Sequence, residues 1–259
     1  MIILETIAVA FAMFSAIPVP QPEWNRRNMR YALCAFPLIG LLCGLGWWGW
    51  TALSGVFSFP LLLKAGGLCL IPVLITGGIH LDGYADTCDA LSSYADFQKK
   101  QEILKDPHCG AFALIRTCSY FIAYLALCGG VDTSARALIV MGLGFMLERS
   151  LSGLAIASFP MAKNTGLAHT FASAADKKRV RIILLILSVL LSLGMAAAYP
   201  FAGSLAASAA WLVLLRYCHV AKKQFGGTSG DLAGWFLQKA EIWMLAVLTA
   251  CQMIGRVLL

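Results

Sequence analysis

Residues 76–91, TGGIHLDGYADTCDAL, gather acidic side chains, an imidazole and glycines in a chain that is otherwise rich in apolar residues. If the segment is helical from Asp82, then Asp82, Asp86 and Asp89 stand at i, i+4 and i+7, on one face. Like charges at this spacing destabilise a helix, so we expect a cation to neutralise them. Mg²⁺ suits such oxygens and commonly takes one or two carboxylates together with substrate phosphates. The alternative interpretation is an acidic helix N-terminus at a membrane surface, where Asp is favoured for local reasons.

Other groups that could serve a ligand lie close by. His80 stands beside the aspartates, and Gly83 would let a ligand approach the backbone closely. Further along, the segment EILKDPHCGAFALI offers Lys105 and Asp106 before an apolar run. The Asp-Pro-His sequence is also typical of a simple turn, so both interpretations stay open for Asp106.

A glycine-rich loop is the second candidate phosphate site. The segment FGGTSGDLAGWFLQKAE contains Gly226, Gly227, Gly230 and Asp231. Backbone amides in such a loop can hold phosphate oxygens, and Asp231 adds an acid. The loop taken alone is a weak signal.

A charged pair interrupts a later apolar run. Glu148 and Arg149 lie where a charge is costly and usually marks a site or an ion pair. Neighbours on a helix point about 100° apart, and Arg149 is taken as a candidate substrate-binding residue.

The elements that must position these groups are membrane helices. The chain is 59% hydrophobic and 13% charged, whereas about a quarter of the residues in a soluble domain are charged. We predict an all-α, polytopic membrane bundle with about 7–8 spans in a single domain, residues 1–259. The first apolar run suits an interfacial helix as well as a span, and no motif indicates nucleic-acid binding. The apolar runs predict spans near 2–19, 31–55, 60–79, 111–130, 135–159, 182–200, 203–219 and 240–258.

The basic residues orient the chain. Four long polar segments, near 20–30, 80–110, 160–181 and 220–239, hold with their flanks 15 of the 20 Lys and Arg residues, and the short connections between the other span ends hold none. By the positive-inside rule the long segments face the cytoplasm, and the candidate site lies at cytoplasmic helix ends. Attraction to anionic membrane lipid accounts for much of the net charge of +7.

Three segments together resemble the cobalamin synthase family, and the likeness runs in order along nearly the whole chain. They are GGIHLDGYADTCDAL, KDPHCGAFALI and FGGTSGDLAGWFLQKAE. The family signature falls on His80, Asp82, Gly83, Asp86 and Asp89, then on Lys105, Asp106, Gly110, Ala111 and Phe112, and finally on Gly226, Gly227, Gly230 and Asp231. Three positions depart from the family pattern: Ala16 stands in place of an arginine, Ala90 stands where a glycine is common, and Lys163 is a poor match to another arginine.

The resemblance implies a magnesium-dependent transferase of the cell membrane. Members of this family are expected to join adenosylcobinamide-GDP to α-ribazole, or to its 5′-phosphate, and to release GMP. Asp82, Asp86 and Asp89 would then hold Mg²⁺, while Lys105 and the 226–230 amides would bind the diphosphate. His80 or Asp82 would take the proton of the attacking hydroxyl, and a second copy of the chain remains a candidate partner.

Two other classes are weighed against this interpretation. A CDP-alcohol phosphotransferase would also place aspartates around a metal, but it usually shows an arginine that DGYADT lacks. A cation-coupled transporter predicts charges near mid-bilayer and broken helices in two related halves. Only Glu148 and Arg149 fit that pattern.

Overall fold

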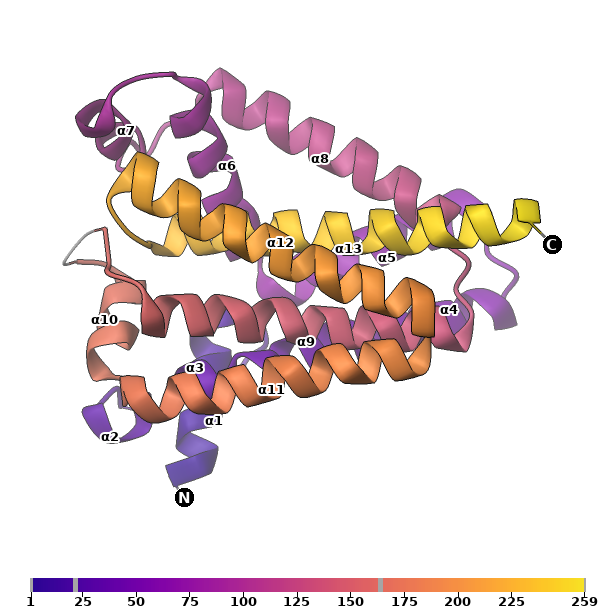
Figure 1. Cartoon of the computed structure of the whole chain (residues 1–259), viewed down its shortest axis with the longest axis horizontal. Helices are drawn as coiled ribbons and strands as arrows, with labels where there is room; N and C mark the ends of the chain where they lie inside the picture. The colour runs from indigo at the N-terminus through magenta and orange to yellow at the C-terminus, as the bar shows by residue number, and fades with distance from the viewer. Residues whose placement is uncertain (1, 21–22, 163–164, 259) are drawn as a thin grey trace.

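The computed structural model describes residues 2–20, 23–162 and 165–258, which fold into a bundle of α-helices (Figure 1). The predicted arginine replacement Lys163 lies outside these residues. Within the described ranges the only β-type pairing is an isolated bridge between Met161 and Thr228. The helices are α1 (Ile2–Phe14), α2 (Arg26–Met29), α3 (Ala32–Ala35), α4 (Pro37–Val56), α5 (Leu61–Thr76), α6 (Ile79–Ser92), α7 (Phe97–Ile103), α8 (Ala111–Gly130), α9 (Ala135–Ser158), α10 (Leu167–Ala174), α11 (Lys177–Ala198), α12 (Pro200–Phe225) and α13 (Gly230–Leu258).

The number of spans agrees with a membrane bundle. In the part of the chain that the structure describes, six helical segments are long and apolar enough to cross a bilayer, and the bent pair α5 and α6 would make a seventh. The first predicted span is a 13-residue helix, α1, which is shorter than the roughly 20 residues that a span needs. The six are Ala32–Val56, Ala111–Gly130, Ala135–Ser158, Lys177–Ala198, Pro200–Phe225 and Gly230–Val257.

Helix α9 lies at the centre of the bundle. It packs against α4, α11, α12 and α13, and most of its residues are buried. Two glycines of α4 allow the closest of these approaches: a Cβ at Gly40 or Gly44 would overlap the backbone of Phe145 or Gly142 on α9. Small residues spaced by four are a common means of bringing membrane helices together.

The predicted span near 60–79 is not a straight helix. α5 ends at Thr76, and Gly77 and Gly78 follow with φ of +65° and +80°. These left-handed conformations suit glycine, and they turn the chain by 95° into α6. α6 then packs against α8 and α13. The predicted helical stacking of Asp82, Asp86 and Asp89 is confirmed, because all three lie within α6.

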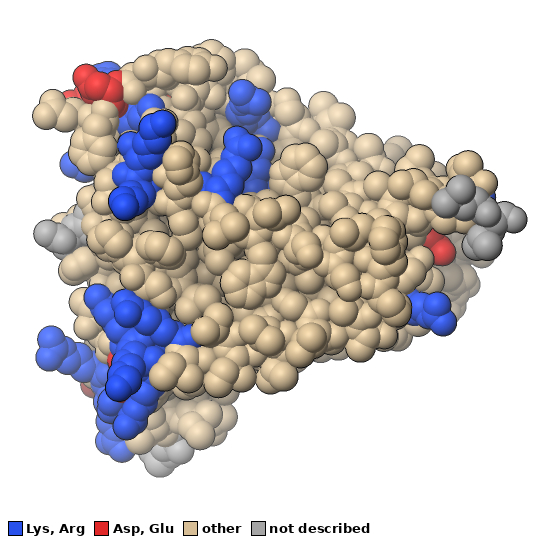
Figure 2. Space-filling model, in the orientation of Figure 1, with Lys and Arg blue, Asp and Glu red and all other residues tan. Residues whose placement is uncertain are grey.

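One end of the bundle collects the polar connections. α9 and α12 end there, and α11 and α13 begin there, close to α7 and α10 (Figure 1). Figure 2 shows most of the visible Lys and Arg side chains gathered over this end. Lys177 and Lys178 at the start of α11 and Lys222 and Lys223 near the end of α12 are exposed at this end. We call this the basic end of the molecule.

Candidate active site

A cavity of about 600 Å³ lies at the basic end, enclosed by parts of α1, α3, α6, α9, α10 and α13 and by the loops beside them. Its volume falls within the range of small-molecule sites. Six of the residues singled out from the sequence line it, although they come from three separate segments. They are His80, Asp82, Gly83, Lys105, Gly230 and Asp231.

The crossing of α6 and α13 brings two of these segments together. A Cβ on Gly83 would lie 2.8 Å from the carbonyl oxygen of Asp231, and a Cβ on Gly234 would lie 2.6 Å from the carbonyl oxygen of His80. Neither position has room for a side chain, since real Cβ atoms do not approach so closely. The sequence predicted that Gly83 lets a ligand approach the backbone. The structure shows that Gly83 also lets α6 and α13 pack closely, a role that the sequence interpretation missed.

Asp89 lies away from the cavity, at the start of α8. Its Oδ1 accepts a hydrogen bond of 3.3 Å from the backbone N–H of Ala113. Its carboxylate also packs against Gly110, where a Cβ would overlap it. An acidic group in this place satisfies an N–H at a helix N-terminus and opposes the positive end of the helix dipole. The structure thus gives Asp89 a local task in joining α6 to α8.

The fit of a divalent cation rests on a smaller set of groups. Asp82 is exposed at the cavity, whereas Asp86 is half-buried on α6 and engages other groups of the protein. Among the described residues, no three His, Cys, Asp or Glu side chains form a ready-made cation site. The donor chemistry fits Mg²⁺ bound by one or two carboxylates with substrate oxygens completing the shell.

The glycine-rich loop has two parts with different surroundings. The Gly227 N–H donates to the Ala221 carbonyl (3.0 Å), and the Thr228 N–H donates to the Pro160 carbonyl (2.8 Å). Gly226, with φ of +73°, ends α12 and packs against Phe97. The sequence predicted that the backbone amides of residues 226–230 bind phosphate. This prediction is corrected for two of them, because Gly226 ends α12 and the Gly227 N–H is bonded to Ala221, so both glycines support the fold.

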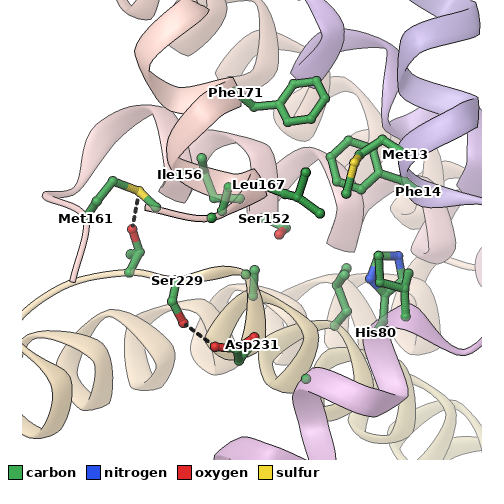
Figure 3. Close-up of a pocket in the computed structure, with 18 of the residues that line it drawn as sticks. Met13, Phe14, His80, Ser152, Ile156, Met161, Leu167, Phe171, Ser229 and Asp231 are labelled. Carbon is green, nitrogen blue, oxygen red and sulfur yellow. Dashed lines mark hydrogen bonds between the residues drawn. The ribbon is translucent and has the colours of Figure 1, made fainter. Parts of the chain in front are cut away.

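The second half of the loop faces the cavity. Ser229, Gly230 and Asp231 all line it. The Ser229 Oγ accepts a hydrogen bond of 3.2 Å from the Leu232 N–H, so it caps the start of α13. Ser229 also donates to Asp231 Oδ2 at 3.5 Å (Figure 3).

Lys105 and Asp106 diverge although they are neighbours. Lys105 is exposed and lines the cavity. Asp106 points into its own loop, where Oδ1 accepts from the His108 N–H (2.9 Å) and lies 2.7 Å from Nδ1 of the same residue. The His108 N–H, followed by its ring, lowers the pKa of Asp106. Of the two interpretations of Asp-Pro-His, the turn is the one that these contacts support.

Arg149 does not reach the cavity. Its guanidinium Nη1 lies 2.6 Å from Glu148 Oε1, and the side chains of this pair are 1% and 0% exposed. Nη1 also donates to the Phe145 carbonyl (2.9 Å). Long side chains bridge the angle between neighbours on the helix, so the pair is an ion pair in the core. The predicted contact of Arg149 with substrate is not found.

The sequence interpretation missed several residues of the cavity. Its apolar side includes Phe14, Phe36 and Phe171, and Ser152 of α9 lies between this side and the polar one. Figure 3 shows Phe171, Met13 and Phe14 on one side, with Ser229, Asp231 and His80 on the other. Nothing in the local sequence marks these residues, because they belong to ordinary apolar helices.

The fold and the cavity define the class of protein: a polytopic helical membrane protein whose imidazole, amine and carboxylates meet at one end of the bundle. The chain belongs to the cobalamin-5-phosphate synthase family, whose model matches residues 6–249.

Curated relatives extend over nearly the same length. A protein of Lachnoclostridium phytofermentans is 42% identical over 95% of this chain and 94% of its own. Proteins of Clostridium botulinum and Geobacillus kaustophilus are 30% and 32% identical, over 96% and 92% of this chain and 98% and 94% of their own. All three carry the name adenosylcobinamide-GDP ribazoletransferase. No solved structure matches the chain.

Proposed function

We propose that this protein transfers the cobinamide phosphate of adenosylcobinamide-GDP to α-ribazole or its 5′-phosphate, yielding adenosylcobalamin or its 5′-phosphate and GMP. The family and the names of the relatives support this reaction, and they favour neither a phospholipid enzyme nor a transporter. The observation that carries the proposal is the meeting of His80, Asp82, Lys105 and Asp231 at one cavity. Phosphoryl transfer requires mainly positioning and charge neutralisation, which these groups supply.

The chemical step exchanges one P–O bond for another. A ribose hydroxyl of α-ribazole attacks the phosphorus that carries cobinamide, and the bond from that phosphorus to GMP breaks. His80 Nε2, or the carboxylate of Asp82, takes the hydroxyl proton. The ammonium of Lys105 and the start of α13 at Ser229 and Gly230 bind phosphate oxygens, and GMP leaves as a phosphate monoester.

Mg²⁺ is the proposed cofactor, held by Asp82 and Asp86 together with substrate phosphates. When bound, it supplies charge neutralisation to the diphosphate. Asp89 was predicted as a third ligand, and its hydrogen bond to Ala113 competes with that role. Asp82→Asn should raise the magnesium concentration needed for half-maximal turnover while leaving membrane insertion intact. Asp132→Asn, at an exposed position at the opposite end of the bundle, is the matched control.

The site is proposed to face the cytoplasm, because the basic end carries it. Cys109, which is exposed in the loop beside Lys105, provides a test. A membrane-impermeant thiol reagent should label Cys109 in inside-out vesicles and not in intact cells, with Cys109→Ser as the control. Cys88 is buried and is therefore unsuitable as a second reporter.

Membrane lipid is a further proposed partner. An apolar groove of about 440 Å³ between α9, α11 and α12 opens near Arg181, beside the basic end. A lipid chain fits such a groove, and the neighbouring cations favour an anionic head group. Association of two copies of the chain stays a prediction.

The reaction is tested with the purified protein in lipid vesicles with Mg²⁺. GMP should appear from adenosylcobinamide-GDP only when α-ribazole or its 5′-phosphate is present. Release of GMP at the same rate without either acceptor would indicate a hydrolase and would overturn the proposed transfer.

A further inference from the structure

The cavity has an apolar half that the transfer chemistry does not use. Phe14, at the end of α1, lies 4.5 Å from the ring of Phe36 and 5.5 Å from the ring of Phe171, measured between ring centroids. Phe36 and Phe171 are almost fully buried, at 2% and 1% exposure. Three aromatic side chains, from α1, from the junction between α3 and α4, and from α10, thus line one wall (Figure 3).

Two buried polar atoms border this aromatic wall. Ser152 Oγ and His80 Nε2 belong to cavity-lining residues that are 0% and 7% exposed, and neither atom makes a hydrogen bond to the described residues. Some buried hydroxyls of the bundle bond to the carbonyl four residues earlier, as Ser188 of α11 does to Leu184 and Thr249 of α13 to Leu245, whereas Ser152 Oγ does not. Buried polar groups are nearly always paired, so this arrangement points to a ligand with polar atoms in the cavity.

We propose that the apolar half of the cavity is the seat of the benzimidazole ring of α-ribazole, an inference that rests on the proposed function. The ring lies against Phe14, Phe36 and Phe171, and Ser152 Oγ donates to its unsubstituted nitrogen. The ribose then extends towards His80, which lies on the polar side of the cavity. The attacking hydroxyl is thereby placed next to a group that can take its proton.

The size and polarity of the cavity select this occupant over the other substrate. The corrin ring with its side chains has several times as many atoms as a ribosyl benzimidazole, and about 600 Å³ suits only a smaller ligand. The guanine of the GDP group is flat as well, but its edge carries several donors and acceptors. The apolar half offers only Ser152 to such an edge, with His80 at its border with the polar side, and buried polar groups left unpaired are costly. The corrinoid and its GDP group therefore remain at the open, basic side of the cavity.

The proposal assigns a function to α1. This helix is too short to span the membrane, and its buried residues Val9 and Met13 pack in one cluster with Leu33, Ile156 and Phe171. Phe14 follows at its end and lines the cavity. α1 is therefore a wall of the ribazole seat.

The test separates the two substrates. Phe171→Ala should raise KM for α-ribazole about 10-fold, because an aromatic contact and its buried area are lost, and KM for adenosylcobinamide-GDP should change little. Ser152→Ala should raise KM for α-ribazole by about 3- to 10-fold, the effect of one neutral hydrogen bond. Phe201→Ala, at a 70% exposed position on α12, is the matched control and should change neither KM.

Binding without turnover distinguishes this inference from the proposed function. Equilibrium dialysis of α-ribazole against the purified wild-type protein and the two cavity variants should show the same order of affinities in the absence of the corrinoid. If the wild-type protein is active and both variants fold and keep the wild-type KM for α-ribazole, the proposed benzimidazole site is contradicted, while the proposed reaction is not. A rise confined to KM for adenosylcobinamide-GDP would assign the aromatic wall to guanine instead. Should Phe171→Ala fail to fold, Ser152→Ala, which deletes one oxygen, carries the test.

Discussion

Gly83 of α6 lies directly against the backbone of Asp231 on α13: a Cβ at Gly83 would be 2.8 Å from both the Cα and the carbonyl oxygen of Asp231. This contact joins the acidic segment of residues 76–91 to the start of the last helix. It is the reason that Asp82 and Asp231 line one cavity although they are far apart in the sequence.

The first prediction concerns that contact. Gly83→Ala should separate α6 from α13, destabilise the protein by about 1–3 kcal/mol as overpacked cores do, and abolish most turnover. The measurement is thermal unfolding together with GMP release. Gly66→Ala is the matched control, because a Cβ on this α5 residue meets nothing within 4 Å. Equal melting temperatures for the two variants would show that the helices tolerate a wider crossing.

The second prediction separates Asp89 from the metal site. Asp89→Ala should lower the free energy of unfolding by about 1 kcal/mol, the usual value of a helix cap, and Asp89→Asn should lower it less, because an amide oxygen can still accept from Ala113. Turnover of folded Asp89→Asn protein should stay closer to wild type than that of Asp82→Asn. A raised magnesium requirement in Asp89→Asn would instead make Asp89 a ligand.

The third prediction concerns the phosphate contact of Lys105. Lys105→Met should lower kcat/KM for adenosylcobinamide-GDP about 10- to 150-fold, the value of a charge-assisted hydrogen bond, and leave KM for α-ribazole nearly unchanged. A ground-state contact would raise KM, whereas a contact that strengthens as GMP departs would lower kcat. Lys99→Met is the control, since Lys99 is exposed and pairs with Glu102 at 3.0 Å. Similar kinetics for both variants would remove Lys105 from the site.

The fourth prediction treats Arg149 as part of the core. Arg149→Met leaves Glu148 buried without its partner and should cost about 3–5 kcal/mol of stability, whereas Glu148→Gln with Arg149→Met should recover part of the loss. The stability of the single and the double variant is measured by thermal unfolding in detergent, and their expression levels are compared. In the fraction of Arg149→Met protein that folds, KM for adenosylcobinamide-GDP should stay unchanged. A stable Arg149→Met variant with a raised KM would restore the predicted substrate contact.

Local properties of the chain were predictable from the sequence. Membrane helices follow from long apolar runs, and the face shared by Asp82 and Asp86 follows from the helical repeat within α6. The candidate groups His80, Asp82 and Lys105 were found for a related reason. Charged and imidazole side chains are easily recognised in a largely hydrophobic chain, and the segments that hold them resemble a known family in order and spacing.

What the sequence alone determined was therefore composition, helical periodicity and the chemical inventory of each segment. Only the tertiary structure decided which members of that inventory meet: Asp89 caps α8, Arg149 pairs with Glu148, and Gly227 supports the fold. It also placed Ser152 and Phe171, which no motif marks, in the wall of the cavity. The physical reason is that helix crossings depend on contacts between distant surfaces, such as Gly83 against Asp231, which the spacing of residues within one segment does not encode.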